Sequence, residues 1–203
     1  YLAELAAGAG AEIRTRCDAV GLLNDSDQTS GVIYERMGRK FSVAASVVIA
    51  ADGVESRVGR WAGIDTKLPL KDMGSAYQMV LAGIQQDDLT GKLYFGRNWI
   101  PNGYIWVFPK GGGTFNVGGG VFNGEADSGE VYGYVRRFIK KMFGHPAVIS
   151  EMTGAIPLAP PLSKPFAAGV LLAGDAARFC NPLSGGGDIY GDALRASGGI
   201  NRR

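Results

Sequence analysis

The sequence is poor in the side chains that build disulfide frameworks and metal sites. It has only 2 cysteines and 1 histidine among 203 residues. Two cysteines in a chain of this length do not make a disulfide framework, so a reducing compartment such as the cytoplasm is expected. No metal site is predicted. No apolar run reaches the ~18–20 residues that a membrane-spanning helix needs, so any contact with a membrane is expected at its surface.

The sequence also lacks a strong charge of either sign, since its formal net charge is +2. Proteins that bind nucleic acid usually carry a clustered basic face, so no nucleic-acid partner is expected. The nearest approach to such a cluster, Arg136-Arg137 with Lys140-Lys141, has helical spacing and is interpreted as a solvated helix face. With 46% apolar and 20% charged residues, the chain has the composition of an ordinary globular protein of one or two domains.

Glycine, in contrast, is abundant, with 32 copies. The glycines cluster at residues 111–120 and 185–199 rather than spreading as low-complexity sequence. Clustered glycines favour tight turns and a close approach of the backbone to a ligand over disorder.

The order of secondary structure begins with short strands. Residues 11–50 carry β-branched runs separated by polar turns, which predict strands, the first of them over Ala11–Arg16. The last run, Val47–Ala51, is continuously apolar, as expected of a strand buried on both faces. From about residue 70, longer strand patterns with turns at Asn102-Gly103 and Gly111–Gly113 predict an antiparallel meander.

The second half of the chain predicts a helix and then a return to strands. Residues 128–143 have the apolar spacing of an amphipathic helix, and a strand is predicted over Ile149–Leu158. This order predicts a mixed α/β (α+β) fold, in which a nucleotide-binding domain is interrupted by a sheet-rich insert. The predicted domains are residues 1–69, residues 70–160 for the insert, and residues 161–203 for the return to the first domain.

The two ends of the chain predict an internal piece of a longer protein. The chain opens on Tyr1 in a helix-forming segment without an initiating methionine, and it stops at Arg203 where a helix is expected to continue. A complete small protein with frayed ends is the alternative.

A carboxylate and a glycine-rich segment stand near the end of the chain. An apolar strand pattern runs from Gly169 into Gly174-Asp175, and Asn181-Pro182 with a glycine triplet, Gly185–Gly187, then leads into a helix pattern. In α/β folds, a strand that delivers a carboxylate before a glycine-rich helix entry holds the sugar and phosphate parts of a nucleotide cofactor. The alternative, a carboxylate that only caps the next helix, leaves Asn181-Pro182 and the glycines unexplained.

A second carboxylate follows a buried strand far upstream. Asp52-Gly53 comes directly after the Val47–Ala51 run, with Ser56, Arg57 and Arg60 downstream. By itself this segment fits an ordinary strand-to-helix turn with an acidic N-cap slightly better than a ligand site.

An aromatic strand lies between these two segments. Tyr104, Trp106 and Phe108 alternate along the chain, so they share one face of the strand. Such a stripe is usually part of a core. Here, however, Pro109 follows it, and after a short spacer comes the glycine run Gly118–Gly120.

Together these motifs resemble those of the geranylgeranyl reductase family of FAD-dependent oxidoreductases. The Asp-Gly and Gly-Asp segments look like the two flavin fingerprints of the wider hydroxylase and reductase superfamily. Tyr-x-Trp-x-Phe-Pro followed by Gly-x-Gly looks like the substrate motif of this family. The resemblance implies a partial FAD-binding Rossmann-like domain with an inserted antiparallel-sheet substrate domain, without the amino-terminal Gly-x-Gly-x-x-Gly unit.

The resemblance also assigns residues to the cofactor and the substrate. The residues assigned to the cofactor are Asp52, Gly53, Arg57, Gly174, Asp175, Ala176, Asn181, Pro182, Gly185, Gly186 and Gly187. The residues assigned to the substrate are Tyr104, Trp106, Phe108, Pro109, Gly118 and Gly120. No catalytic residue is assigned.

The implied activity is an FAD-dependent reductase that saturates C=C bonds of a prenyl (geranylgeranyl) group on a lipid or pigment. NADPH or a reduced electron carrier is the expected donor. The prenylated substrate is the expected partner, and contact with a membrane surface follows from it. The alternatives are a flavin-dependent halogenase, whose Gly-Trp-x-Trp-x-Ile-Pro strand is also similar, an aromatic hydroxylase, and a truncated chain without activity of its own. Many hydroxylases have a histidine where this chain has Arg178.

Three positions depart from the family pattern or allow a second role. The fingerprint arginine is expected three residues after Ser56, where this chain has Gly59 followed by Arg60, so the arginine that serves the turn stays open. Asp188 stands where the family usually has an apolar residue, and a reduced flavin would repel it. Cys180 is interpreted as a small buried hydrophobe, with a redox or proton-donor role as the alternative.

Overall fold

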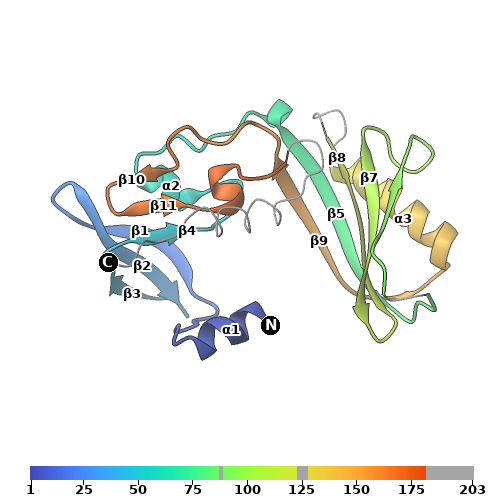
Figure 1. Cartoon of the computed structure of the whole chain (residues 1–203), viewed down its shortest axis with the longest axis horizontal. Coiled ribbons are helices and arrows are strands. Elements are labelled where there is room, and N and C mark those ends of the chain that lie inside the picture. Colours follow the sequence, from blue (N-terminus) through green and yellow to red (C-terminus); the bar gives the residue numbers. More distant parts are fainter. Residues whose placement is uncertain (87–88, 123–127, 182–203) are drawn as a thin grey trace.

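The chain has two lobes in the computed structural model, which describes residues 1–86, 89–122 and 128–181 (Figure 1). The elements of the first lobe are α1 (Leu2–Gly8), β1 (Asp18–Asp25), β2 (Gln28–Arg36), β3 (Arg39–Ala44), β4 (Val48–Ala50), α2 (Arg57–Trp61), β10 (Phe166–Ala167), β11 (Val170–Leu172) and the 3-10 turn η2 (Gly174–Ala177). The elements of the second lobe are the 3-10 turn η1 (Leu70–Asp72), β5 (Met73–Ala82), β6 (Lys92–Phe95), β7 (Gly103–Gly111), β8 (Thr114–Val121), α3 (Ser128–Phe143) and β9 (Ala147–Pro157). Strands β5 and β9 run from the first lobe into the second (Figure 1). This mixed α/β architecture confirms the predicted fold class, whereas the three domain boundaries stay a prediction.

The first lobe contains two small sheets. Strands β1, β2 and β3 form an antiparallel meander, and β10, β11 and β4 form a mixed sheet in that order. Strand β11 pairs with β4 in parallel, with Val170 opposite Val48 and Leu172 opposite Ala50. The hydrophobic core that this mixed sheet forms with α2 and η2 consists of Val48, Ala50, Val58, Val170, Leu172, Ala176 and Ala177. The pairing therefore joins two segments that lie at opposite ends of the sequence.

Two sequence predictions for this lobe are wrong. No strand forms over residues 11–16, because Arg16 adopts a left-handed backbone (φ 55°) and the first strand begins at Asp18. The β4 strand is not buried on both faces, since Ile49 is 68% exposed while its neighbours Val48 and Ala50 are buried. Ile49 is exposed because no described element covers that side of the strand.

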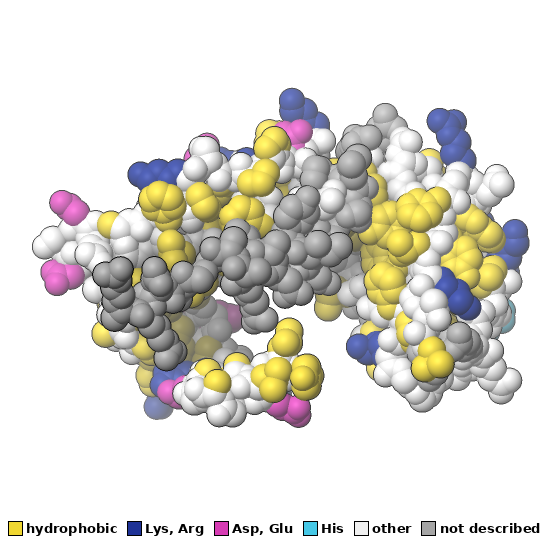
Figure 2. Space-filling view, in the orientation of Figure 1, with side chains coloured by type: hydrophobic (Ala, Val, Ile, Leu, Met, Phe, Trp, Pro, Cys, Tyr) yellow, Lys and Arg dark blue, Asp and Glu magenta, His cyan; other side chains and the backbone are white. Residues whose placement is uncertain are grey.

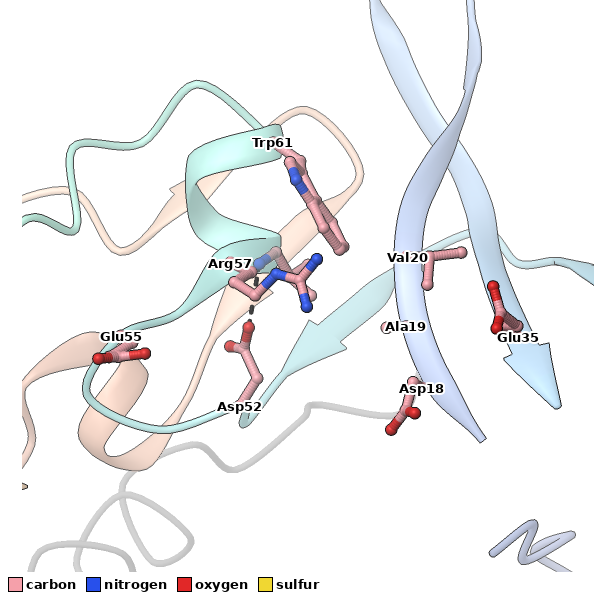
Figure 3. A pocket seen from close by; sticks show the side chains of 9 residues that line it. Asp18, Ala19, Val20, Glu35, Asp52, Glu55, Arg57 and Trp61 are labelled. Atoms are coloured by element: carbon pink, nitrogen blue, oxygen red, sulfur yellow. Dashed lines mark hydrogen bonds between the residues drawn. The ribbon is translucent and has the colours of Figure 1, made fainter. Parts of the chain in front are cut away.

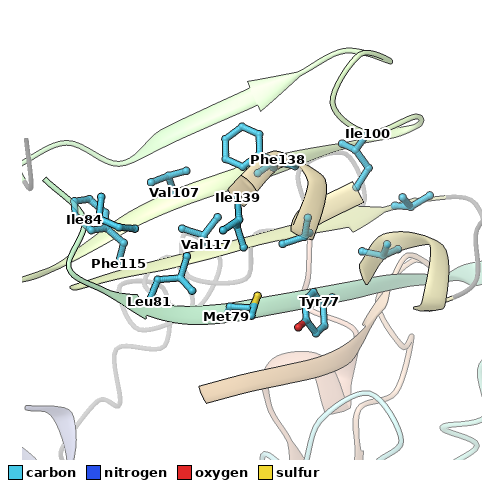
Figure 4. Close-up of a cluster of buried hydrophobic side chains, with 14 residues drawn as sticks. Tyr77, Met79, Leu81, Ile84, Ile100, Val107, Phe115, Val117, Phe138 and Ile139 are labelled. Carbon is cyan, nitrogen blue, oxygen red and sulfur yellow. The ribbon is translucent and has the colours of Figure 1, made fainter. Parts of the chain in front are cut away.

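The second lobe is one antiparallel sheet covered on one face by a helix. The strand order is β6-β7-β8-β5-β9, so the predicted meander is interrupted where β5 inserts between β8 and β9. Helix α3 has the predicted bounds, and its apolar spacing puts Val135 and Phe138 against the sheet. Gly144, at φ 73°, ends the helix and donates its N–H to the carbonyl of Lys140. Figure 4 shows the resulting core, in which strand residues such as Met79 and Val117 face the helix.

Alternation along the strands divides this sheet into a helix face and an open face. The buried residues Ile105 and Val107 of β7 and Phe115 and Val117 of β8 point to the helix face. Their neighbours in sequence point to the open face, which includes the predicted aromatic residues. Figure 2 shows hydrophobic side chains gathered over the strands of this lobe.

Candidate functional site

The parallel pair of β4 and β11 brings the two predicted flavin fingerprints together. The N–H of Ala173 donates to the carbonyl of Ala50 at 2.9 Å, which extends the pairing to the carboxyl ends of both strands. Asp52-Gly53 and Gly174-Asp175 therefore leave the same edge of the sheet. In open α/β sheets, ligands bind in the crevice outside the carboxyl ends of the strands.

Asp52 caps the helix that follows it. Its Oδ1 accepts from the Ser56 hydroxyl at 2.7 Å and its Oδ2 accepts from the Val58 N–H at 3.0 Å. Ser56 is fully buried, and its hydroxyl accepts from the Gly59 N–H at 3.1 Å. Two orphan N–H groups at the start of α2 are satisfied in this way. The structure thus gives Asp52 the cap role that its sequence also allowed, and a part in cofactor binding stays a prediction.

Gly59 explains why the fingerprint arginine is displaced. A Cβ atom added to Gly59 would lie 2.6 Å from Cγ2 of Thr66 and 3.2 Å from Cδ1 of Leu172, so no side chain fits there. The guanidinium of Arg57 instead lies over the ring of Trp61, with its Cζ 5.1 Å from the ring centroid. Arg57 and Trp61 line a cavity of about 390 Å³ together with Asp52, as Figure 3 shows. Of the two candidate arginines, only Arg57 is among the residues that line this cavity.

Removal of the Ser56 hydroxyl is expected to destabilise the first lobe. Ser56→Ala leaves the Gly59 N–H without its acceptor and Asp52 without a donor, so the free energy of unfolding should fall by about 1–2 kcal/mol. Chemical denaturation of the protein as its gene encodes it measures the change. Glu55→Ala is the matched control, because Glu55 is exposed in the same loop, and it should change stability by less than about 0.5 kcal/mol. If the two variants were equally stable, the hydrogen bonds of Ser56 would contribute nothing.

Asp175 has a different environment from Asp52. It lies in η2, directly after β11, and is half-buried. Among the described residues its carboxylate accepts no hydrogen bond, and burial raises its pKa above the ordinary carboxyl range. A partly buried carboxylate without a donor has a hydrogen-bonding requirement that ribityl hydroxyls satisfy.

The glycines on this edge leave room for a ligand. Gly53 (φ 82°) and Gly174 (φ 59°) both have left-handed backbones, which favour glycine. A Cβ atom added at either position would have nothing within 4 Å. The Asp175 carboxylate, which has no donor among residues 1–181 as far as they are described, and this open space beside both glycines fit the ribose and ribityl parts of FAD.

Other predicted cofactor residues lie in η2 or follow it. Ala176 is buried in the small core, and Asn181 is half-buried. Arg178 has a left-handed backbone (φ 61°), and its Nη2 donates to the carbonyl of Lys67 at 2.9 Å. Its side chain is therefore tied to the chain segment after α2. The remaining predicted positions, which are Pro182, Gly185, Gly186, Gly187 and Asp188, lie outside the described residues.

The pKa values of Cys180 and Tyr104 relate this edge to the aromatic strand of the second lobe. Burial, and then the charge of Asp175, raises the pKa of the Cys180 thiol to about 11. Burial, and then Cys180, also raises the pKa of the Tyr104 hydroxyl. Tyr104 of β7 and Asp175 of η2 therefore both lie within electrostatic range of Cys180. Cys180 is buried, as predicted, and its thiol keeps its proton at neutral pH.

The predicted aromatic residues form a row on the open face of the sheet. The ring centroids of Tyr104 and Trp106 lie 6.0 Å apart, and those of Trp106 and Phe108 lie 6.4 Å apart with nearly parallel planes. Phe95 of β6 extends the row to Tyr104 at 5.4 Å and is 65% exposed. Pro109 pairs with Phe115, whose side chain is in the core, so it lies on the helix face and not in the row.

The positions of Gly118, Gly119 and Gly120 in β8 alternate between the two faces of the sheet. Gly119 faces the core, where an added Cβ would lie 3.0 Å from Val135. Gly118 and Gly120 face the open side. An added Cβ at Gly118 would lie 2.4 Å from Cζ2 of Trp106, whereas one at Gly120 would make only ordinary contacts of 3.7 Å or more. Gly118 therefore makes room for the indole, whereas Gly120 is buried beside Ile156 and Phe122.

Two amide side chains on this face, those of Asn116 and Gln78, are not among the site residues predicted from the sequence. Both contribute to a hydrogen-bonded row with Trp106. The sequence indicates the face of Asn116, because it stands two residues before Gly118 in the same strand. It does not indicate the position of Gln78, which depends on the pairing of β5 with β8.

Comparison with protein families gives two matches. Residues 1–102 match the family described as FAD binding domain, which is just over half of the chain. Residues 72–156 match the geranylgeranyl reductase catalytic domain, which covers the five-stranded sheet and α3.

Individual relatives agree with these matches. A digeranylgeranylglycerophospholipid reductase of Methanosarcina mazei is 40% identical over 188 residues, which cover 92% of this chain and 46% of that protein. The corresponding reductase of Methanocella arvoryzae is 39% identical over 93% of this chain and 48% of its own length. The chain therefore spans about half the length of the curated relatives it matches.

Solved structures show the same fold. A geranylgeranyl bacteriochlorophyll reductase-like protein of Thermoplasma acidophilum is similar with a TM-score of 0.79 and 33% identity, over 97% of this chain and 53% of that chain. A flavin-dependent brominase is similar with a TM-score of 0.67 at 16% identity, over 96% of this chain and 53% of that chain. At that identity the second likeness is one of fold alone.

Proposed function

Because the chain belongs to the geranylgeranyl reductase family of FAD-binding oxidoreductases, we propose that its protein saturates C=C bonds of a prenyl group on a lipid. Relatives named digeranylgeranylglycerophospholipid reductase make a geranylgeranyl ether lipid the first substrate to test. A prenylated pigment is the second.

One observation carries this proposal. The edge that carries Asp175, whose carboxylate accepts no hydrogen bond from the described residues, lies within electrostatic range, through Cys180, of the aromatic row that begins at Tyr104. A flavin held at the first feature would therefore lie next to an apolar surface formed by the second. Reduction of an alkene requires this juxtaposition, because the reacting carbon must be held close to the hydride source.

The residues of the chain have separate parts in this reaction. When bound, FAD supplies the hydride chemistry. Asp175 accepts hydrogen bonds from the ribityl hydroxyls, and Asp52 and Arg57, which line one cavity, contact the ribose and pyrophosphate parts. Tyr104, Trp106 and Phe108 form one wall of the prenyl site, where each buried methylene contributes about 0.8 kcal/mol of binding energy.

The electron donor, partners and location belong to the same proposal. NADPH or a reduced electron carrier supplies electrons to the flavin, and the prenylated lipid is the partner. Within the part of the chain that the structure describes, no helix is long and apolar enough to cross a membrane. We place the protein in the cytoplasm, in contact with a membrane surface when it takes its lipid.

Mass spectrometry of a prenyl lipid tests the proposed function. The protein as its gene encodes it is loaded with FAD and mixed with digeranylgeranylglycerophospholipid, with NADPH in one arm and chemically reduced ferredoxin in the other. The lipid should gain hydrogen stepwise as its double bonds are saturated, and a fully saturated phytanyl lipid is the control. An FAD-loaded, reduced protein that leaves both geranylgeranyl chains intact would refute the proposal.

A further inference from the structure

A row of hydrogen-bonded side chains crosses the open face of the second lobe. Trp106 donates from Nε1 to Oδ1 of Asn116 at 2.8 Å, and Asn116 donates from Nδ2 to Oε1 of Gln78 at 3.0 Å. Gln78 then donates from Nε2 to the sulfur of Met152 at 3.6 Å, within range for this weak acceptor. The row thus spans β7, β8, β5 and β9, and each amide uses both its oxygen and its nitrogen.

Register explains why these groups meet. Trp106 and Gln78 both pair with Gly118, one from each neighbouring strand. Since Gly118 has no side chain, the indole extends across β8, and its Cζ2 lies 2.4 Å from where a Cβ of Gly118 would be. This orientation brings Nε1 to Asn116, two residues earlier on the same face of β8.

From this arrangement we infer that Asn116 and Gln78 are positioning residues that hold the Trp106 indole against the sheet as a wall of the substrate cavity. The inference rests on the proposed function for the identity of the substrate. It assigns the two amides a role in prenyl-chain binding, although they act through the indole and not by contact with the reacting carbons.

The chemistry of an apolar cavity supports this role. An unpaired donor or acceptor beside a bound prenyl chain would lose its water without replacement, which is costly. In the row, the polar atoms of Trp106, Asn116 and Gln78 satisfy one another along the sheet. The stacked ring of Phe108 continues the surface beside the indole. A prenyl chain therefore meets an indole face whose polar group is already paired.

Asn116→Leu tests the inference because it keeps the size of the side chain and removes its acceptor and donor. In the FAD-loaded protein as its gene encodes it, the KM for the prenyl lipid should rise roughly three- to tenfold, with a smaller change in kcat. In the Trp106→Phe background, which has no indole N–H, the same substitution should change the KM by less than about twofold. Thr114→Val is the matched control, since Thr114 lies on the same face of β8 outside the row.

The indole N–H provides a readout that does not depend on activity. In ¹⁵N-labelled protein the resonance of the Trp106 indole, assigned by its loss in Trp106→Phe, should shift in Asn116→Leu and in Gln78→Met but not in Thr114→Val. An unchanged indole resonance in Asn116→Leu would refute the hydrogen bond between Trp106 and Asn116. An equal effect on KM in the native and Trp106→Phe backgrounds would refute the claim that Asn116 acts through Trp106. A native protein that reduces no prenyl lipid overturns the proposed function and the wall role together, and the indole signal separates that outcome from a failure of the row.

Discussion

Asp175→Ala is expected to weaken FAD binding by roughly 100-fold or more in the protein as its gene encodes it. The carboxylate is half-buried and accepts no hydrogen bond from the described residues, so its acceptor capacity is available to the cofactor. Hydrogen bonds to a charged group contribute about 1.5–3 kcal/mol each, and a carboxylate on the ribityl chain forms more than one. Titration of the apoprotein with FAD, followed by flavin fluorescence, measures the change.

The stability of the apoprotein and its affinity for FAD should both depend on the protonation of Asp175, with opposite signs. Burial raises the pKa of Asp175 in the folded apoprotein above its unfolded value, so the folded state binds more protons between the two pKa values. The stability of the apoprotein should therefore fall as pH rises through this window. FAD affinity should rise over the same window, because the ionised carboxylate is the acceptor for the hydroxyls. Asp175→Asn should remove both slopes.

Asp27→Ala is the charge-matched control for Asp175→Ala. Asp27 is exposed in the turn between β1 and β2, away from the edge formed by β4 and β11. It should leave FAD affinity unchanged. If both aspartate variants bound FAD like the native protein, the assignment of Asp175 to the cofactor would fail.

Phe138→Ala is expected to lower the free energy of unfolding by about 3–5 kcal/mol. Phe138 is 1% exposed and lies at the centre of the aromatic packing under α3. Its ring centroid is 4.8 Å from that of Tyr94, 5.2 Å from that of Trp99 and 6.1 Å from that of Phe143. Truncation leaves a cavity that three large, rigid rings and a paired sheet cannot readily fill.

Urea denaturation measures this loss, and Lys140→Ala is the control on the same helix. Lys140 is exposed, and alanine is at least as good a helix former, so the control should change stability by less than about 0.5 kcal/mol. A loss below about 1 kcal/mol for Phe138→Ala would mean that the second lobe does not depend on this aromatic cluster.

The sequence predicts the strands and the helix of the second lobe because their patterns are strong and local. Helix α3 has the predicted bounds, and the aromatic strand of β7 forms where its alternation places it. Prediction is weaker where burial depends on partners that are distant in the chain. The run around Ile49 looks like a strand buried on both faces, yet only the side facing α2 and η2 is covered.

The sequence identifies the carboxylates of the candidate site but not the hydrogen-bond donors around each of them. Asp52 and Asp175 look alike in sequence, since each carboxylate adjoins a glycine after an apolar strand. The two differ in their hydrogen-bond donors, because Ser56 and Val58 supply Asp52 with donors from the adjoining helix start. The amide row is hidden from the sequence, since it requires Gln78 to pair with Gly118 across a distance that no local pattern encodes.

The pairing of β4 with β11 has a consequence for biosynthesis. The segment that ends at Ala50 leaves the ribosome long before its partner Leu172, and the whole five-stranded sheet is made in between. Closing so long a loop is slow compared with forming local contacts. The second lobe can therefore pack before β11 completes the mixed sheet of the first lobe. The edge at the carboxyl ends of β4 and β11 is thus among the last parts of the described chain to become complete. If Asp175 holds the cofactor as proposed, FAD can bind there only after this residue has emerged from the ribosome.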